Sequence, residues 1–97
     1  MTKYLLSTVK MAAKFEIIFL FRDALKLYNE AFVLDSTDHL VLGNRSITYL
    51  KLGKAKAALE DAELAIKLRP DWAKGYLRKG TALRVLGNHT EAFKVIT

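Results

Sequence analysis

The chain has 97 residues, of which 52% are hydrophobic and 27% are charged. That length predicts a single domain over residues 1–97 and excludes a two-domain enzyme, and the composition excludes a disordered or low-complexity chain. The absence of cysteine excludes disulfides, thiolate metal sites and thiol nucleophiles. The longest apolar run, residues 17–21, is far shorter than the roughly 20 residues that a membrane helix needs. We therefore expect a cytoplasmic or nuclear protein with no membrane partner.

The formal net charge is +6, and it is unevenly distributed. Residues 1–38 are balanced, whereas residues 73–97 carry five cations and one carboxylate. A positive C-terminal part suits an acidic partner, which can be a peptide or a nucleic acid. The sign of the charge does not choose between them.

Apolar spacing and local stop signals divide the chain into six expected helices. In chain order they lie near residues 3–18, 21–34, 38–52, 55–68, 72–86 and 89–96. The breaks are marked by a capping cluster at residues 35–38, by Gly53 and Gly87, and by Pro70 before a fresh helical start. No segment shows the alternating pattern of a strand, so the sequence predicts an all-α fold.

Small and large apolar residues recur at an offset of 34 positions, a period typical of one class of helical repeat. Three sets of residues fall in register: Phe15, Tyr49 and Leu83; Ala12, Ser46 and Gly80; and Ala24, Ala58 and Ala92. Small residues let helix backbones approach each other, and large residues fill the gaps between them. The pattern therefore predicts two packed helices per repeat, with Ala58 and Ala65 at the closest approach.

With these residues, the chain resembles the tetratricopeptide repeat family. The repeats would cover about residues 5–38, 39–72 and 73–97, the last cut short, and the second is the clearest. The resemblance is weak over residues 1–20, where Phe19 replaces the turn glycine seen at Gly53 and Gly87. It implies antiparallel helix pairs stacked as a right-handed α-solenoid of about two and a half repeats. It also implies a protein-interaction module whose concave groove is lined by the first helix of each repeat.

The first helices carry a set of residues similar to the clamp by which co-chaperones of this family hold a Glu-Glu-Val-Asp C-terminus of heat-shock chaperones. Asn44, Lys74 and Arg78 match that clamp, and charge-assisted bonds suit a ligand with two carboxylates. In repeat one, Val9 and Ala13 stand where the clamp has Lys and Asn. A shift of one residue would bring in the neighbouring cations, so the candidate peptide-binding residues are Asn44, Lys74, Arg78, Lys10 and Lys14.

A plainer interpretation places Lys74 and Arg78 on a solvated helix face. The pair Gly43-Asn44 argues for a ligand, because both residues are poor helix formers, and we expect an open backbone there. Trp72, Tyr49 and Tyr76 are expected in the core. The acidic cluster of Glu60, Asp61 and Glu63 is expected on a solvated outer face.

Other chemistry is not supported by the sequence. His39 and His89 have no neighbouring ligands of the kind that a metal site needs, and Ser46 and Thr81 have no histidine in register. We expect no enzyme, no metal site and no cofactor. Nucleic-acid binding is the alternative from another class, although the basic face has few aromatic residues free to stack on bases. A repeat scaffold for a different protein ligand is the other alternative.

Both ends of the chain present apolar residues that its own helices do not obviously cover. Phe93 and Ile96 lie close to the C-terminus, and residues 15–21 are apolar all round the expected helix. These two ends favour a homodimer or an exchange of the first helix between chains.

Overall fold

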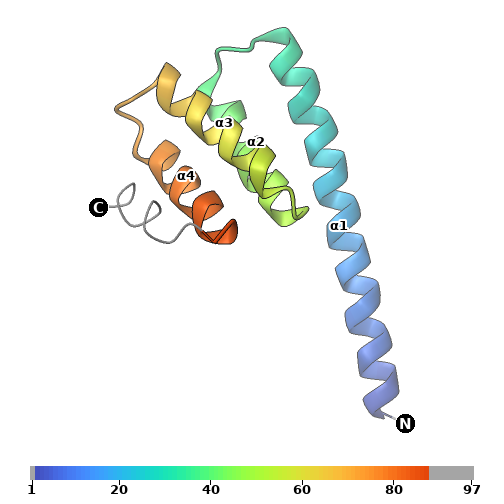
Figure 1. Ribbon diagram of the computed structural model, residues 1–97. Coiled ribbons are helices and arrows are strands. Elements are labelled where there is room, and N and C mark those ends of the chain that lie inside the picture. Colours follow the sequence, from blue (N-terminus) through green and yellow to red (C-terminus); the bar gives the residue numbers. More distant parts are fainter. Residues whose placement is uncertain (1, 88–97) are drawn as a thin grey trace.

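A computed structural model describes residues 2–87, with the side chains of residues 14–87, and these residues form four helices (Figure 1). The helices are α1 (Thr2–Leu34), α2 (His39–Lys51), α3 (Ala55–Leu68) and α4 (Ala73–Val85). The described residues contain no strand, and the all-α prediction is confirmed. The helix expected near residues 89–96, with Phe93 and Ile96, lies outside the described residues.

Local signals explain where α2 begins and where α2 and α4 end. The Asp38 carboxylate accepts hydrogen bonds from the backbone N–H of Leu40 (2.9 Å) and Val41 (3.4 Å), which caps the N-terminus of α2. After α2 and α4 the chain turns through Gly53 (φ 77°) and Gly87 (φ 86°), a left-handed conformation that glycine adopts without steric cost. These ends therefore agree with the sequence-based expectation to within a residue or two.

The core lies where α2, α3 and α4 meet, and small side chains dominate it. Leu42, Ala58, Ala62, Ala65 and Ala82 are fully buried. The Ser46 hydroxyl donates a 2.8 Å hydrogen bond to the backbone carbonyl of Ala58, which ties α2 to α3. Because alanine occupies so little space, the backbones of neighbouring helices come close together. The expectation that Ala58 and Ala65 lie at helix contacts is confirmed.

The helix order in space follows the order in the chain. α1 contacts α2, α2 contacts α3 and α4, and α3 contacts α4, whereas α1 contacts neither α3 nor α4. In Figure 1 the α2–α3 pair lies between α4 and the long α1. α2 and α4 are thus the first helices of two successive repeats, and α3 is the second helix between them.

The first repeat differs from the expected helix pair. Residues 2–34 form one continuous helix of 33 residues, so the break expected between residues 18 and 21 is wrong. Phe19 stands 34 positions before Gly53, and a phenylalanine has no ready access to the left-handed turn that ends α2. The helix therefore continues, and its N-terminal half runs past the end of the α2–α3 pair (Figure 1).

Candidate functional site: the groove between the first helices

A groove of about 370 Å³ lies between α2 and α4. Its lining comes in equal parts from the two helices: Ile47, Leu50 and Lys51 of α2, and Arg78, Thr81 and Val85 of α4. Ile47 and Thr81 stand 34 positions apart, as do Lys51 and Val85. The groove is therefore formed by equivalent faces of two first helices, with apolar walls and two cationic side chains.

Arg78 has unused hydrogen-bonding capacity at a buried atom in this groove. Its side chain is partly buried, and within residues 14–87 its Nε is a buried side-chain nitrogen without a hydrogen-bond partner. Burial lowers the pKa of the Arg78 guanidinium below its ordinary value, because a cation loses hydration there. A buried cationic donor without an acceptor costs free energy. An anionic ligand in the groove would remove that cost.

Asn44 and Lys74 lie near the groove but do not line it. Asn44 is exposed on α2, at the position equivalent to Arg78, and its backbone carbonyl accepts a 2.9 Å hydrogen bond from the Thr48 hydroxyl. Lys74 is exposed one helical turn before Arg78, beside a shallow hollow of about 280 Å³ that Tyr76 and Leu77 also line. The register thus places an amide and a cation on the two helices, toward the N-terminal ends of both.

The structure does not bring Lys14, a candidate of repeat one, to the groove. Lys14 is exposed on α1, one turn before Ile18, and Ile18 already lies at the level of Lys51 and Leu52, where α2 ends. Lys14 therefore lies about 6 Å further along the helix axis, beyond the end of α2. The side chain of Lys10 lies outside the described residues.

The sequence interpretation missed Lys51, the second cation in the groove. Lys51 lies seven residues after Asn44, which is two turns along the same helix face. That spacing is the signal that would have identified it. Lys51 also borders a second hollow of about 320 Å³ between α1 and the end of α2.

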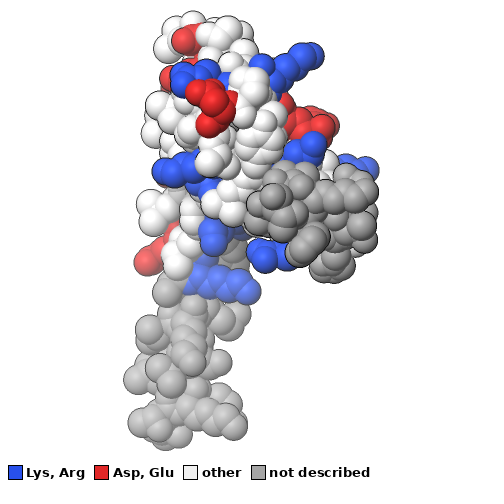
Figure 2. Space-filling view, turned by 90° about the vertical axis from the view of Figure 1, so that its left-hand side faces the viewer, with Lys and Arg blue, Asp and Glu red and all other residues white. Residues whose placement is uncertain are grey.

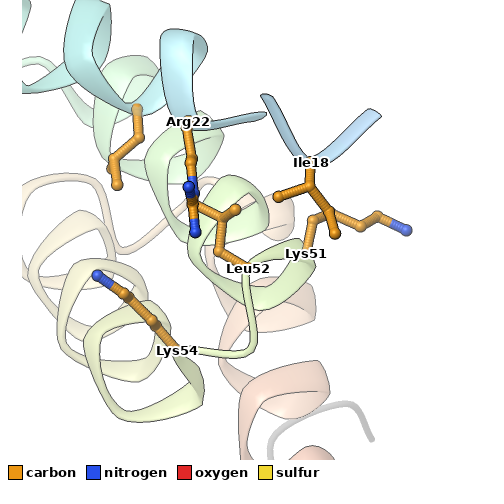
Figure 3. A pocket seen from close by; sticks show the side chains of 6 residues that line it. Ile18, Arg22, Lys51, Leu52 and Lys54 are labelled. Carbon is orange, nitrogen blue, oxygen red and sulfur yellow. The ribbon is translucent and has the colours of Figure 1, made fainter. Parts of the chain in front are cut away.

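This second hollow has an apolar floor and a cationic rim. In Figure 3 the Arg22 side chain extends toward Leu52, the Lys54 side chain extends to the left of Leu52, and the Lys51 amino group points away to the right. On the face in Figure 2, Lys and Arg are spread over most of the described surface, and Asp and Glu lie mainly toward its upper end. Away from its upper end, this face of the molecule is therefore favourable for an anion.

One expectation about charge is wrong. Asp61 does not lie on a solvated face but is 6% exposed, and it accepts hydrogen bonds from Arg45 at 2.7 and 2.8 Å. Arg45 also stacks over the Phe32 ring at 4.3 Å and donates to the Asn29 amide oxygen at 3.2 Å. The bond to Asp61 raises the pKa of the Arg45 guanidinium. This ion pair joins α1, α2 and α3 and is structural. Glu60 and Glu63 are exposed, as expected.

The expectation of an open backbone at Gly43 is also wrong, because Gly43 faces a neighbouring side chain. Gly43 is buried, and a Cβ atom placed on it would lie 2.3 Å from the Trp72 ring. Gly75 flanks the same ring, 3.5 Å from its built Cβ, and His39 meets it edge-on with centroids 4.9 Å apart. Trp72 thus fills space that the two glycines leave. Tyr76 donates to the Pro70 carbonyl at 2.7 Å and has a structural role as well.

The described residues support neither a metal site nor a membrane-spanning helix. They contain no cluster of three or more His, Asp or Glu side chains that could hold a metal ion. None of the helices α1 to α4 is long and apolar enough to cross a membrane. His89 lies outside the part of the chain that the structure describes.

The repeat register, the helix order and the groove between first helices define a class of helical-repeat protein. Residues 41–71 match the family model described as tetratricopeptide repeat. Among solved structures, the second TPR of Spaghetti (RPAP3) bound to the HSP90 peptide SRMEEVD superposes with a TM-score of 0.73 and 32% identity. The match covers 78% of this chain and 73% of that one. The chain belongs to the tetratricopeptide repeat family, as the sequence predicted.

Three curated relatives also contain tetratricopeptide-like segments similar to this chain. The chain is 46% identical over 74 residues to the protein STIP1 homolog of Dictyostelium discoideum, which covers 76% of this chain. It is 43% identical over 72 residues to tetratricopeptide repeat protein 28 of Homo sapiens (74% of this chain), and 37% identical over 76 residues to the Hsp70-Hsp90 organising protein of Plasmodium falciparum (75%). It spans 13%, 3% and 30% of the lengths of these three relatives, respectively.

Proposed function

We propose that the groove between α2 and α4 binds the C-terminal carboxylates of an acidic peptide, such as a heat-shock chaperone tail. The observation that carries this proposal is Arg78, whose buried Nε has no hydrogen-bond partner within the described residues. A peptide that ends in Asp presents two carboxylates, and each charge-assisted hydrogen bond contributes about 1.5–3 kcal/mol. The solved relative that carries an HSP90 peptide supports the same ligand class.

The remaining residues have separate roles in this proposal. Asn44 and Lys74 supply an amide and an ammonium next to Arg78, and these three residues hold the terminal carboxylates. Lys51 lies about 10 Å along α2 from Asn44, given a rise of 1.5 Å per residue. An extended peptide covers that distance in about three residues. Lys51 therefore meets a carboxylate upstream of the C-terminus.

Such a groove holds its ligand without changing it chemically, so the proposed role is that of an adaptor and not of an enzyme. Nucleic-acid binding is less well supported, because it needs aromatic rings free to stack on bases. The Tyr76 hydroxyl is bonded to Pro70, and the Tyr49 ring faces the Arg45 guanidinium at 5.8 Å. Neither ring is free for that purpose.

Calorimetric titration with the peptide SRMEEVD, as the free acid and as the C-terminal amide, tests the proposal. The free acid should bind more tightly, and Arg78→Ala should weaken its binding tenfold or more, equivalent to about 1.4 kcal/mol. Lys51→Ala should weaken binding of both peptides, because its partner lies upstream. Lys67→Ala, at an exposed position on α3, is the control and should leave binding unchanged. Equal binding of acid and amide would refute a carboxylate clamp.

A further inference from the structure

The N-terminal half of α1 carries apolar residues at register positions of a first repeat helix, but those that are described are not packed in the same way. Three large residues occupy equivalent positions in the 34-residue register: Phe15, Tyr49 and Leu83. Leu83 is 6% exposed and Tyr49 is partly buried, whereas Phe15 is 56% exposed. Ile17, Phe19 and Leu20 are between 51% and 67% exposed. The described side chains of this half of the helix therefore lack the partner that those of α2 and α4 have.

The C-terminal half of α1 shows the complementary gap. On α3, positions 58, 61, 62 and 65 are all buried, and Ser46 of α2 bonds to the Ala58 carbonyl there. The equivalent positions on α1 are 24, 27, 28 and 31; Leu27 is 64% exposed and the others are only partly buried. The surface on which a first helix should pack is therefore open.

The two incomplete surfaces cannot meet within one chain, because α1 is continuous. Phe15 and Leu27, for example, lie about 18 Å apart along a single helix axis. In a second copy the same surfaces are available. Residues 2–34 carry five cations and three carboxylates, so the apolar contact between two such helices is opposed by only a small net charge on each.

We propose that two copies of this chain associate by pairing their α1 helices antiparallel, so that residues 2–18 of each copy pack on residues 21–34 of the other. The partner's first helix replaces the one that the chain cannot fold back on itself. The Ser46–Ala58 hydrogen bond fixes the register of α2 on α3, and subtracting 34 places position 12 of one copy opposite position 24 of the other. Such an isologous pair has its two-fold axis at residue 18.

The pairing also completes the groove. α2 and α4, the first helices of two successive repeats, lie side by side with the groove between them. The partner's residues 2–18, packed on α1 as a first helix, lie on the opposite side of α2 from α4. They bring position 10 of the partner, which is equivalent to Asn44 and Arg78 in the 34-residue register, to the side of the groove that the chain itself leaves open. The association does not depend on a bound peptide, so it can be tested separately from the proposed function.

Light scattering of the peptide-free protein on a sizing column, at tens of micromolar, measures the association. We expect twice the chain mass of 11.0 kDa. Phe19→Gly restores a turn glycine at the position equivalent to Gly53 and should convert the dimer to a monomer that keeps its helical circular dichroism. Phe19→Ala removes the same aromatic ring but favours a helix, so it should stay dimeric. A monomeric wild type, or the loss of dimer in both variants, would overturn the proposal.

Cross-linking tests the register of the two helices without a substitution at Phe19. The chain contains no cysteine of its own, so a single introduced cysteine can be followed. Ile18→Cys lies at the proposed two-fold axis and should form an intermolecular disulfide on mild oxidation. Leu34 is 87% exposed, but the two cysteines of a Leu34→Cys dimer would lie about 48 Å apart. It should not cross-link. Equal cross-linking at both positions would contradict the antiparallel arrangement.

Discussion

Gly43 occupies a helix interior because of a residue that is distant in the sequence. A Cβ atom added to Gly43 would lie only 2.3 Å from the Trp72 ring, which is closer than two such atoms can pack. Gly43→Ala should therefore destabilise the fold by about 1–3 kcal/mol through overpacking, although alanine is the better helix former by about 1 kcal/mol. The midpoint of urea unfolding, read by circular dichroism, measures the change.

The neighbouring residue is the control for that substitution. Asn44 is exposed on the same helix, so Asn44→Ala should change the free energy of unfolding by no more than about 0.5 kcal/mol, or raise it. If Gly43→Ala were as stable as Asn44→Ala, the close packing of Trp72 on Gly43 would not be energetically important.

Arg45 and Asp61 form an ion pair whose contribution to stability depends on its burial. The two side chains are 12% and 8% exposed, so removing one partner leaves the other charge poorly hydrated. Arg45→Met should lower the free energy of unfolding by about 3 kcal/mol. Chemical denaturation at neutral pH is the measurement.

Repeat one suggests the compensating change. Met11 and Leu27 stand 34 positions before Arg45 and Asp61, so the double variant Arg45→Met, Asp61→Leu replaces the ion pair with residues from the equivalent places. Replacing a buried ion pair with apolar residues is often neutral or stabilising, and the double variant should recover most of the lost stability. A loss equal to the sum of the two single variants would show that the charges are not coupled.

At the scale of helices, small residues set how closely α2 and α3 approach. Ala58 is fully buried, and its carbonyl accepts the Ser46 hydroxyl at 2.8 Å. Ala58→Leu adds three carbon atoms at this contact and should cost about 1–3 kcal/mol. Ala73→Leu, at the exposed first position of α4, is the matched control and should be close to neutral. Similar thermal midpoints for the two variants would contradict the close helix approach.

Helix ends were predictable from the sequence where a local signal marks them. Asp38, Gly53 and Gly87 act through their own backbone and nearest neighbours, so α2, α3 and α4 were expected within a residue or two of their observed bounds. The end expected near residue 18 rested on the repeat register alone. Phe19 supplies no stop signal there, and the local preference for a continuous helix decides the structure.

The candidate site divides in the same way. The spacing of Asn44, Lys74 and Arg78 follows from helix geometry, so their placement on two neighbouring first helices was predictable. The role of Gly43 was not, because it depends on a ring 29 positions later in the chain. Asp61 was misassigned for a similar reason, since only the fold brings Arg45 beside it. Whether these residues bind a peptide stays a prediction.

For the molecule as a whole, the long first helix determines the shape. The radius of gyration is 15.9 Å and the extents are 53 × 35 × 18 Å, whereas a compact chain of this length would have a radius of about 12–13 Å. The excess comes from α1, whose 33 residues span about 50 Å at 1.5 Å per residue. Its exposed apolar side chains include Phe15, Ile17, Phe19 and Leu20 toward the N-terminal half and Leu27 in the C-terminal half. The shape and the need for a partner therefore have the same origin.

Trp72 gives this molecule a built-in spectroscopic probe, because it is the single tryptophan of the chain. Its ring lies between Gly43 and Gly75, with His39 at its edge, where α2 meets the start of α4. Indole emission shifts with the polarity around the ring, so it monitors this helix junction without any label. The junction forms one end of the α2–α4 interface that carries the groove. A change in the spacing between α2 and α4 would therefore shift the wavelength of the Trp72 emission maximum.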